Sequence, residues 1–60
     1  MNKKEEITNK YSKIIEKGIF YAKKGNHKLA INCFSDAISI DRLNHEAYIN
    51  LSNIYFINKD

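Results

Sequence analysis

The chain has 60 residues, of which 43% are apolar and 28% charged, and its formal net charge is +3. This apolar content excludes a disordered chain, and no segment approaches the roughly 20 apolar residues that span a bilayer. A chain this short forms one small domain that buries only about 60% of the surface its unfolded form exposes. We therefore expect a thin core and a need for contact with another chain.

The charge is unevenly distributed along the chain. Residues 1–28 contain eight lysines and three glutamates, whereas residues 29–60 contain two basic and four acidic residues. The basic half suits either an anionic partner or a solvated helix surface. The charged N-terminus has no apolar signal-peptide core, and the single Cys33 cannot form an internal disulfide. These features lead us to expect a cytoplasmic protein.

The N-terminal half predicts one amphipathic helix. Residues 1–6 are polar, and we expect them to be disordered or frayed. Beyond them, apolar or small residues recur every three or four positions, at Ile7, Tyr11, Ile14, Gly18 and Tyr21. A second apolar row, Ile15, Ile19 and Ala22, lies on an adjacent face, which predicts neighbours on two sides. The helix should end near Lys24, because Gly25 supplies the left-handed residue that closes a helix.

A second helix should follow directly. Asn26 is a suitable N-cap, and the apolar stripe comprises Leu29, Ala30, Cys33, Phe34, Ala37 and Ile38. The short connection through Gly25 and Asn26 predicts an antiparallel hairpin. The small Ala30 and Ala37 should let the two backbones approach, so that Phe34 and Tyr21 fill the gap. We expect this helix to end around Ile40 or Asp41.

The remaining residues predict a third helix. Asn44 is the expected N-cap, and Glu46 lies near the positive end of the helix dipole. One face comprises Ala47, Tyr48, Leu51, Ser52 and Tyr55, and another comprises Ile49, Asn53 and Phe56. A turn toward a further helix would begin at Asn58–Asp60.

The pattern of the first helix recurs in the third at an offset of 34 residues. Ile14, Gly18 and Tyr21 return as Tyr48, Ser52 and Tyr55, with Ala30, Phe34 and Ala37 between the two sets. A period of this length is typical of helical repeats, whose units cannot bury their apolar faces alone. The sequence therefore predicts a full repeat at 11–44 and a half repeat at 45–60, within a single unit at 7–60.

These residues resemble the tetratricopeptide repeat. The family pattern runs Trp-x₂-Leu-Gly-x₂-Tyr, then Ala-x₃-Phe, a later Ala and a Pro. The resemblance implies an all-α fold, an antiparallel helical hairpin plus a third helix, as a fragment of an α-solenoid. Lys17 replaces the usual leucine, and Arg42 replaces the proline that ends the second helix. Without that proline, the second helix could run on toward the third and be exchanged between chains.

The stretch from Asn44 to Ser52 is similar to the second repeat of chaperone-adaptor (co-chaperone) proteins, which hold acidic C-terminal tails in a carboxylate clamp. Asn50 falls on one clamp position. The lysine and asparagine that the first helix would contribute are replaced by Ile15 and Ile19. The resemblance leaves a chaperone-related role possible, although most of the clamp is missing.

The leading hypothesis is a protein-interaction module that binds a peptide of a partner on the concave face lined by first helices. The residues expected on that face are Ile15, Ile19, Lys23, Ile49, Asn50, Asn53 and Phe56. The alternative is a homo-oligomer that buries the uncovered third helix through Leu51, Ile54 and Tyr55, with or without helix exchange.

A basic helical nucleic-acid binder is a weaker alternative, because the second helix has Lys28 as its only cation. No residue set suggests catalysis, since His27, His45 and Cys33 match no zinc spacing and the carboxylates are scattered. We predict no enzyme activity, no metal or other cofactor, and neither nucleic-acid nor membrane partners.

Overall fold

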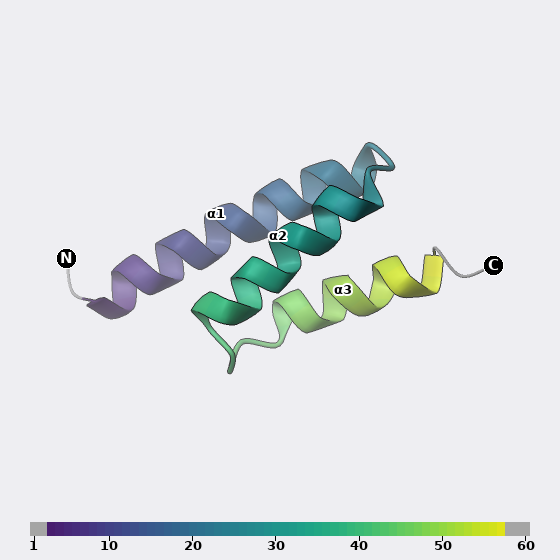
Figure 1. The fold of residues 1–60 in the computed structure, drawn as a ribbon. Helices are drawn as coiled ribbons and strands as arrows, with labels where there is room; N and C mark the ends of the chain where they lie inside the picture. Colours follow the sequence, from purple (N-terminus) through teal and green to yellow (C-terminus); the bar gives the residue numbers. More distant parts are fainter. Residues whose placement is uncertain (1–2, 58–60) are drawn as a thin grey trace.

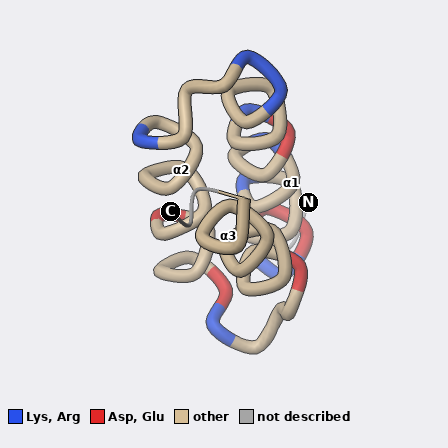
Figure 2. The backbone as a smooth tube through the Cα atoms, turned by 90° about the vertical axis from the view of Figure 1, so that its right-hand side faces the viewer, with Lys and Arg blue, Asp and Glu red and all other residues tan. Residues whose placement is uncertain are grey.

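Three α-helices make up the computed structural model, which describes residues 3–57. Helix α1 spans Lys3–Lys23, α2 spans His27–Ile40 and α3 spans Glu46–Ile57. Helices α1 and α2 form an antiparallel hairpin, and α3 runs in the same direction as α1 (Figure 1). In the view turned by 90°, α3 lies in front of the hairpin, between α1 and α2 (Figure 2). The all-α hairpin with a third helix is the predicted fold.

Helix α1 begins at Lys3, one turn before the predicted start at Ile7. Residues 3–6 are helical, where we expected disordered or frayed chain. Glu5 and Glu6 lie in the first turn, where a negative charge favours the helix dipole. The side chains of residues 3–10 are all exposed, so this turn is not buried in the core. The predicted boundaries of the full and half repeats remain predictions.

The α1–α2 turn follows the sequence prediction closely. Gly25 has a φ of 81°, the left-handed conformation that a side chain would disfavour. The backbone N–H of Asn26 donates to the Tyr21 carbonyl at 2.9 Å, and that of Gly25 donates to the Ala22 carbonyl at 3.0 Å, which is the Schellman arrangement. The Asn26 side chain then accepts from the Leu29 N–H at 3.3 Å and caps α2. One dipeptide therefore ends α1 and starts α2.

The α2–α3 turn corrects one expectation, because α2 does not run on into α3. Asp41 has an extended backbone, with φ −143° and ψ 91°, and its side chain accepts from the Leu43 N–H at 3.3 Å. This local turn replaces the proline that usually ends the helix. The Asn44 side chain accepts from the Glu46 N–H at 3.1 Å, but the first intrahelical bond of α3 runs from the Ile49 N–H to the His45 carbonyl at 3.0 Å. The N-cap position is therefore His45, one residue after the predicted Asn44. The hinge is therefore a capped turn.

The core lies where the three helices meet, and its buried side chains are Tyr11, Ile15, Ala30, Phe34, Ala37, Ala47 and Ile54. The closest approach is between α1 and α2. A Cβ placed on Gly18 would lie 2.6 Å from Cε1 of Phe34, so the ring rests directly on the glycine backbone. The small residues thus allow the helices to approach as expected, with Phe34 buried and Tyr21 half-buried at the joint.

Tyr11 joins the hairpin to the third helix. Its hydroxyl accepts from the backbone N–H of Ala47 at 2.8 Å, across 36 residues of sequence. The N–H groups of a first helical turn have no partner within the helix, so the phenol satisfies one of them in the core. Desolvation raises the pKa of Tyr11, the Ala47 N–H opposes this, and Glu46, Asp41 and Tyr48 add to the rise. Tyr11 thereby fixes where α3 begins against α1.

Candidate interaction surface

The predicted concave face is only partly available to a ligand. Ile15 is 3% exposed and belongs to the same core cluster as Ala47 and Ile54 of α3. Ile15 is therefore a packing residue, and its assignment to an open groove is corrected. The physical reason is that the second apolar row of α1 has a neighbour of its own, because α3 packs on that side of the hairpin.

The other members of the predicted face lie nearer the surface. Ile19 is half-buried against the core, and Lys23 is exposed in the last turn of α1. On α3, Asn53 is exposed, and Ile49 and Phe56 are 60% and 77% exposed. These two apolar side chains lie seven positions apart, so they share one side of α3. They are the apolar residues of the predicted face that are most accessible to a ligand.

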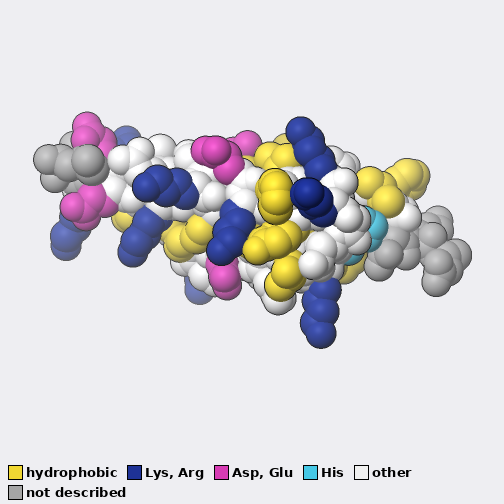
Figure 3. All heavy atoms as spheres, turned by 90° about the horizontal axis from the view of Figure 1, so that it is seen from above, with side chains coloured by type: hydrophobic (Ala, Val, Ile, Leu, Met, Phe, Trp, Pro, Cys, Tyr) yellow, Lys and Arg dark blue, Asp and Glu magenta, His cyan; other side chains and the backbone are white. Residues whose placement is uncertain are grey.

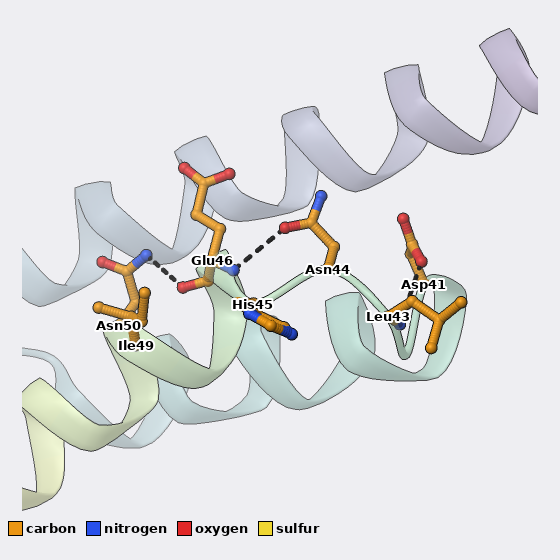
Figure 4. Close-up of a pocket in the computed structure, with 7 residues that line it drawn as sticks. All are labelled: Asp41, Leu43, Asn44, His45, Glu46, Ile49 and Asn50. Carbon is orange, nitrogen blue, oxygen red and sulfur yellow. Dashed lines mark hydrogen bonds between the residues drawn. The ribbon is translucent and has the colours of Figure 1, made fainter.

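The side chain of Asn50 forms a hydrogen bond within its own helix. Its Nδ2 donates to the Glu46 carbonyl at 2.9 Å, and it lines an open hollow together with Ile49 and residues of the α2–α3 turn (Figure 4). The other residues of this hollow are Asp41, Leu43, Asn44, His45 and Glu46. Glu46 and Asn50 project on one side of α3, and His45 projects on the other. The hollow has no α1 residue in its lining, so it does not form a clamp with the first helix.

The predicted self-association face also changes composition. Ile54 is 3% exposed and packs in the core, so it is not left uncovered as expected. Leu51 is half-buried against the same cluster. Tyr55 is 58% exposed, and Tyr48, two helical turns before it, is 43% exposed. The uncovered side of α3 therefore passes through the tyrosines and not through Ile54.

Five α3 residues form this uncovered side, and we call them the α3 arc: Tyr48, Ile49, Ser52, Tyr55 and Phe56. At 100° per residue they span about a third of the helix circumference, opposite to or flanking the buried Ala47 and Ile54. Their counterparts at the 34-residue offset are Ile14, Ile15, Gly18, Tyr21 and Ala22, all buried or half-buried on α1. The 34-residue offset is the sequence signal that pairs each exposed α3 residue with a covered residue of α1.

A second exposed apolar patch lies on α1. From above, apolar side chains gather between lysines over the half of α1 that leads into the α1–α2 turn (Figure 3). Phe20, 54% exposed, packs edge-to-face with Tyr21 at 5.7 Å between ring centres. Lys24 Nζ lies 5.3 Å from the centre of the Phe20 ring, within cation–π range. Phe20 therefore has local partners in Tyr21 and Lys24.

The residues described here show neither a metal site nor a bilayer-spanning helix. Within residues 3–57, no group of three or more His, Cys, Asp or Glu side chains is placed to hold a metal ion. None of the three helices described is both long enough and apolar enough to cross a membrane. Cys33 is a free, half-buried thiol on α2.

The fold is all-α, an antiparallel helical hairpin with a third helix packed against it. Residues 14–42 match the family model of the tetratricopeptide repeat, from the middle of α1 to the turn after α2. This segment, just under half of the chain, is similar to one repeat of that family, as the spacing of Gly18, Tyr21, Ala30, Phe34 and Ala37 predicted. Comparison with curated proteins and with solved structures found no match.

Proposed function

We propose that the chain is a protein-interaction module that binds an apolar segment of a partner protein beside α3. The observation that carries this proposal is the exposure of Ile49 and Phe56, 60% and 77%, on a helix whose counterpart residues on α1 are buried or half-buried. Helical repeats present such surfaces to partners, and the match over residues 14–42 is to a repeat of this kind.

The chemistry of the surface favours an apolar ligand. Ile19, Ile49 and Phe56 supply the apolar contacts, and Asn53 and Lys23 supply polar groups at the edge. An acidic C-terminal tail of the kind held by chaperone adaptors fits less well. The two first-helix clamp positions are Ile15 and Ile19, and the Asn50 amide already donates within α3. We therefore propose an extended or helical peptide with apolar anchors as the ligand.

Selection from a phage-displayed library of random short peptides tests this proposal. We expect selected peptides to carry apolar anchors and to lose at least about tenfold in affinity for F56K. Asn32→Lys is the matched control, because it places the same charge on an exposed α2 residue that is not part of the proposed surface. I19K tests the α1 side, with helicity measured by circular dichroism because Ile19 is half-buried. Equal affinity of F56K and N32K for the selected peptides would contradict the proposal.

A further inference from the structure

The positions of the α3 arc are symmetric about Ser52, and on α3 these positions are exposed, whereas on α1 the corresponding positions are covered. Counted from Ser52, its members lie at −4, −3, 0, +3 and +4, with a small residue at the centre and large apolar residues on both sides. The Cα trace of a helix has a two-fold axis through each residue, perpendicular to the helix. The five positions of the arc therefore map onto one another when the helix is turned end over end, with Ser52 at the centre. The arc is therefore complementary to an antiparallel copy of itself.

The symmetry predicts specific contacts between two such helices. If two α3 helices cross at Ser52, residues at −4 and −3 of one copy lie beside +3 and +4 of the other, given a rise of 1.5 Å per residue. Tyr48 and Ile49 would then pack on the partner's Tyr55 and the partner's Phe56, twice over. The small Ser52 at the crossing lets the helices approach, as Gly18 does where Phe34 rests on α1.

Charge and area support a second copy as the occupant. After Glu46, α3 contains no charged residue, whereas nine of the 21 residues of α1 are charged. Figure 2 shows the same contrast, with the charged positions on α1, α2 and the turns. The exposed parts of the four large arc side chains amount to about 500 Å² per copy, given about 200 Å² for each when fully exposed. Two copies would bury up to about 1,000 Å², which is below the range of stable interfaces and within that of weak, transient ones.

We propose that the α3 arc pairs with the same arc of a second chain, as an antiparallel two-fold contact centred on Ser52. This inference goes beyond peptide capture and uses a different centre on α3. The interface is small, so the dimer forms and dissociates with concentration. Ile49 and Phe56 belong to both surfaces, so a bound peptide weakens the dimer.

Charge substitution at Ser52 tests the two-fold arrangement. Because Ser52 meets its own copy, S52K and S52E each place like charges together at the crossing, which disfavours the pairing. In sedimentation velocity we expect the wild-type mass to rise toward a dimer with concentration. Each variant alone should weaken association at least tenfold, and an equimolar mixture of S52K and S52E should restore it as a heterodimer.

Asn53→Lys is the matched control, because it places a lysine on the next exposed residue, outside the arc. We expect N53K to associate as the wild type does. A wild-type chain that stays monomeric at millimolar concentration overturns the proposal, and so does a mixture that associates no better than either variant alone. Peptide affinity separates the two proposals, because Tyr55 belongs to the arc and not to the peptide surface. Y55K should weaken the dimer and retain the peptides that F56K loses, and loss of those peptides by Y55K would contradict the separation proposed here.

Discussion

Helices α1 and α3 carry the same packing pattern, 34 residues apart, in two different environments. Ile15 is 3% exposed, whereas its counterpart Ile49 is 60% exposed. Gly18 is buried beneath the Phe34 ring, whereas Ser52 is exposed. The difference arises from the neighbours, because α2 and α3 cover α1 and the structure places no described helix over the corresponding side of α3. The same residue pattern thus makes a core on one helix and a surface on the other.

The opposite sides of the two helices, away from the shared packing pattern, also differ. Lys13, Lys17 and Phe20 of α1 are exposed, and their counterparts on α3 are Ala47, Leu51 and Ile54, which pack against the hairpin. The outer side of α1 is thus largely charged and suited to water, whereas the outer side of α3 is apolar. Helix α1 therefore has its packing partners within the chain, whereas the apolar side chains of the α3 arc are left exposed.

The largest expected difference between the helices comes from one substitution made at both. Ile15→Ala should lower the free energy of unfolding by about 2–5 kcal/mol, because it leaves a cavity in the core. Ile49→Ala should change it by less than about 0.5 kcal/mol, because Ile49 makes few contacts within one chain. Urea denaturation followed by circular dichroism at low protein concentration measures both. Equal costs at the two positions would contradict the assignment of core and surface.

Tyr11→Phe should have the next largest effect, because it removes the acceptor that joins the hairpin to α3. The Ala47 N–H, which donates to the phenol at 2.8 Å, would lose its partner in the core. An unsatisfied buried donor costs about 1–3 kcal/mol. We expect the loss to appear mainly as faster amide hydrogen exchange in the first turn of α3, measured by NMR. Exchange that accelerates equally in α1 and α2 would argue against this local role. Tyr55→Phe, at an exposed tyrosine, is the control.

A smaller effect is expected from filling the space at Gly18. Gly18→Ala would place a Cβ 2.6 Å from Phe34 Cε1 and force the ring to shift. Overpacking costs about 1–3 kcal/mol, and the better helix propensity of alanine returns up to about 1 kcal/mol. The net change should therefore be a destabilisation of about 1 kcal/mol in thermal unfolding. Ser52→Ala, at the corresponding position of α3, should be neutral or slightly stabilising. A larger destabilisation from Ser52→Ala than from Gly18→Ala would refute the close contact between Gly18 and Phe34.

The smallest effect should appear at alkaline pH. The pKa of Tyr11 is raised in the folded chain, chiefly by burial, above the ordinary value of 10.0. Its contribution to stability is therefore complete below pH 10 and is lost as pH rises through the folded pKa. The stability advantage of the wild type over Y11F should shrink between pH 9 and higher values in urea denaturation. An advantage that grows with pH would contradict the stated shift.

Local signals in the sequence were sufficient for the fold. Gly25 and Asn26 specify the α1–α2 turn by backbone conformation and capping, both of which depend on near neighbours. The exposed face was harder to predict, because a helical wheel identifies apolar sides and not which neighbour covers each. Ile15 and Ile54 were therefore misplaced, since both lie on sides that other helices cover. The Tyr11 hydrogen bond joins residues 36 apart, and no local pattern indicates it.

The pairing of the α3 arc is tested most directly by isotope-filtered NMR on an equimolar mixture of labelled and unlabelled chain. The account predicts intermolecular contacts between Tyr48 of one copy and Tyr55 or Phe56 of the other, increasing with concentration. It predicts none from Ile15, which is buried within its own chain. The absence of intermolecular contacts at millimolar concentration, or contacts centred on α1 in place of α3, would contradict it.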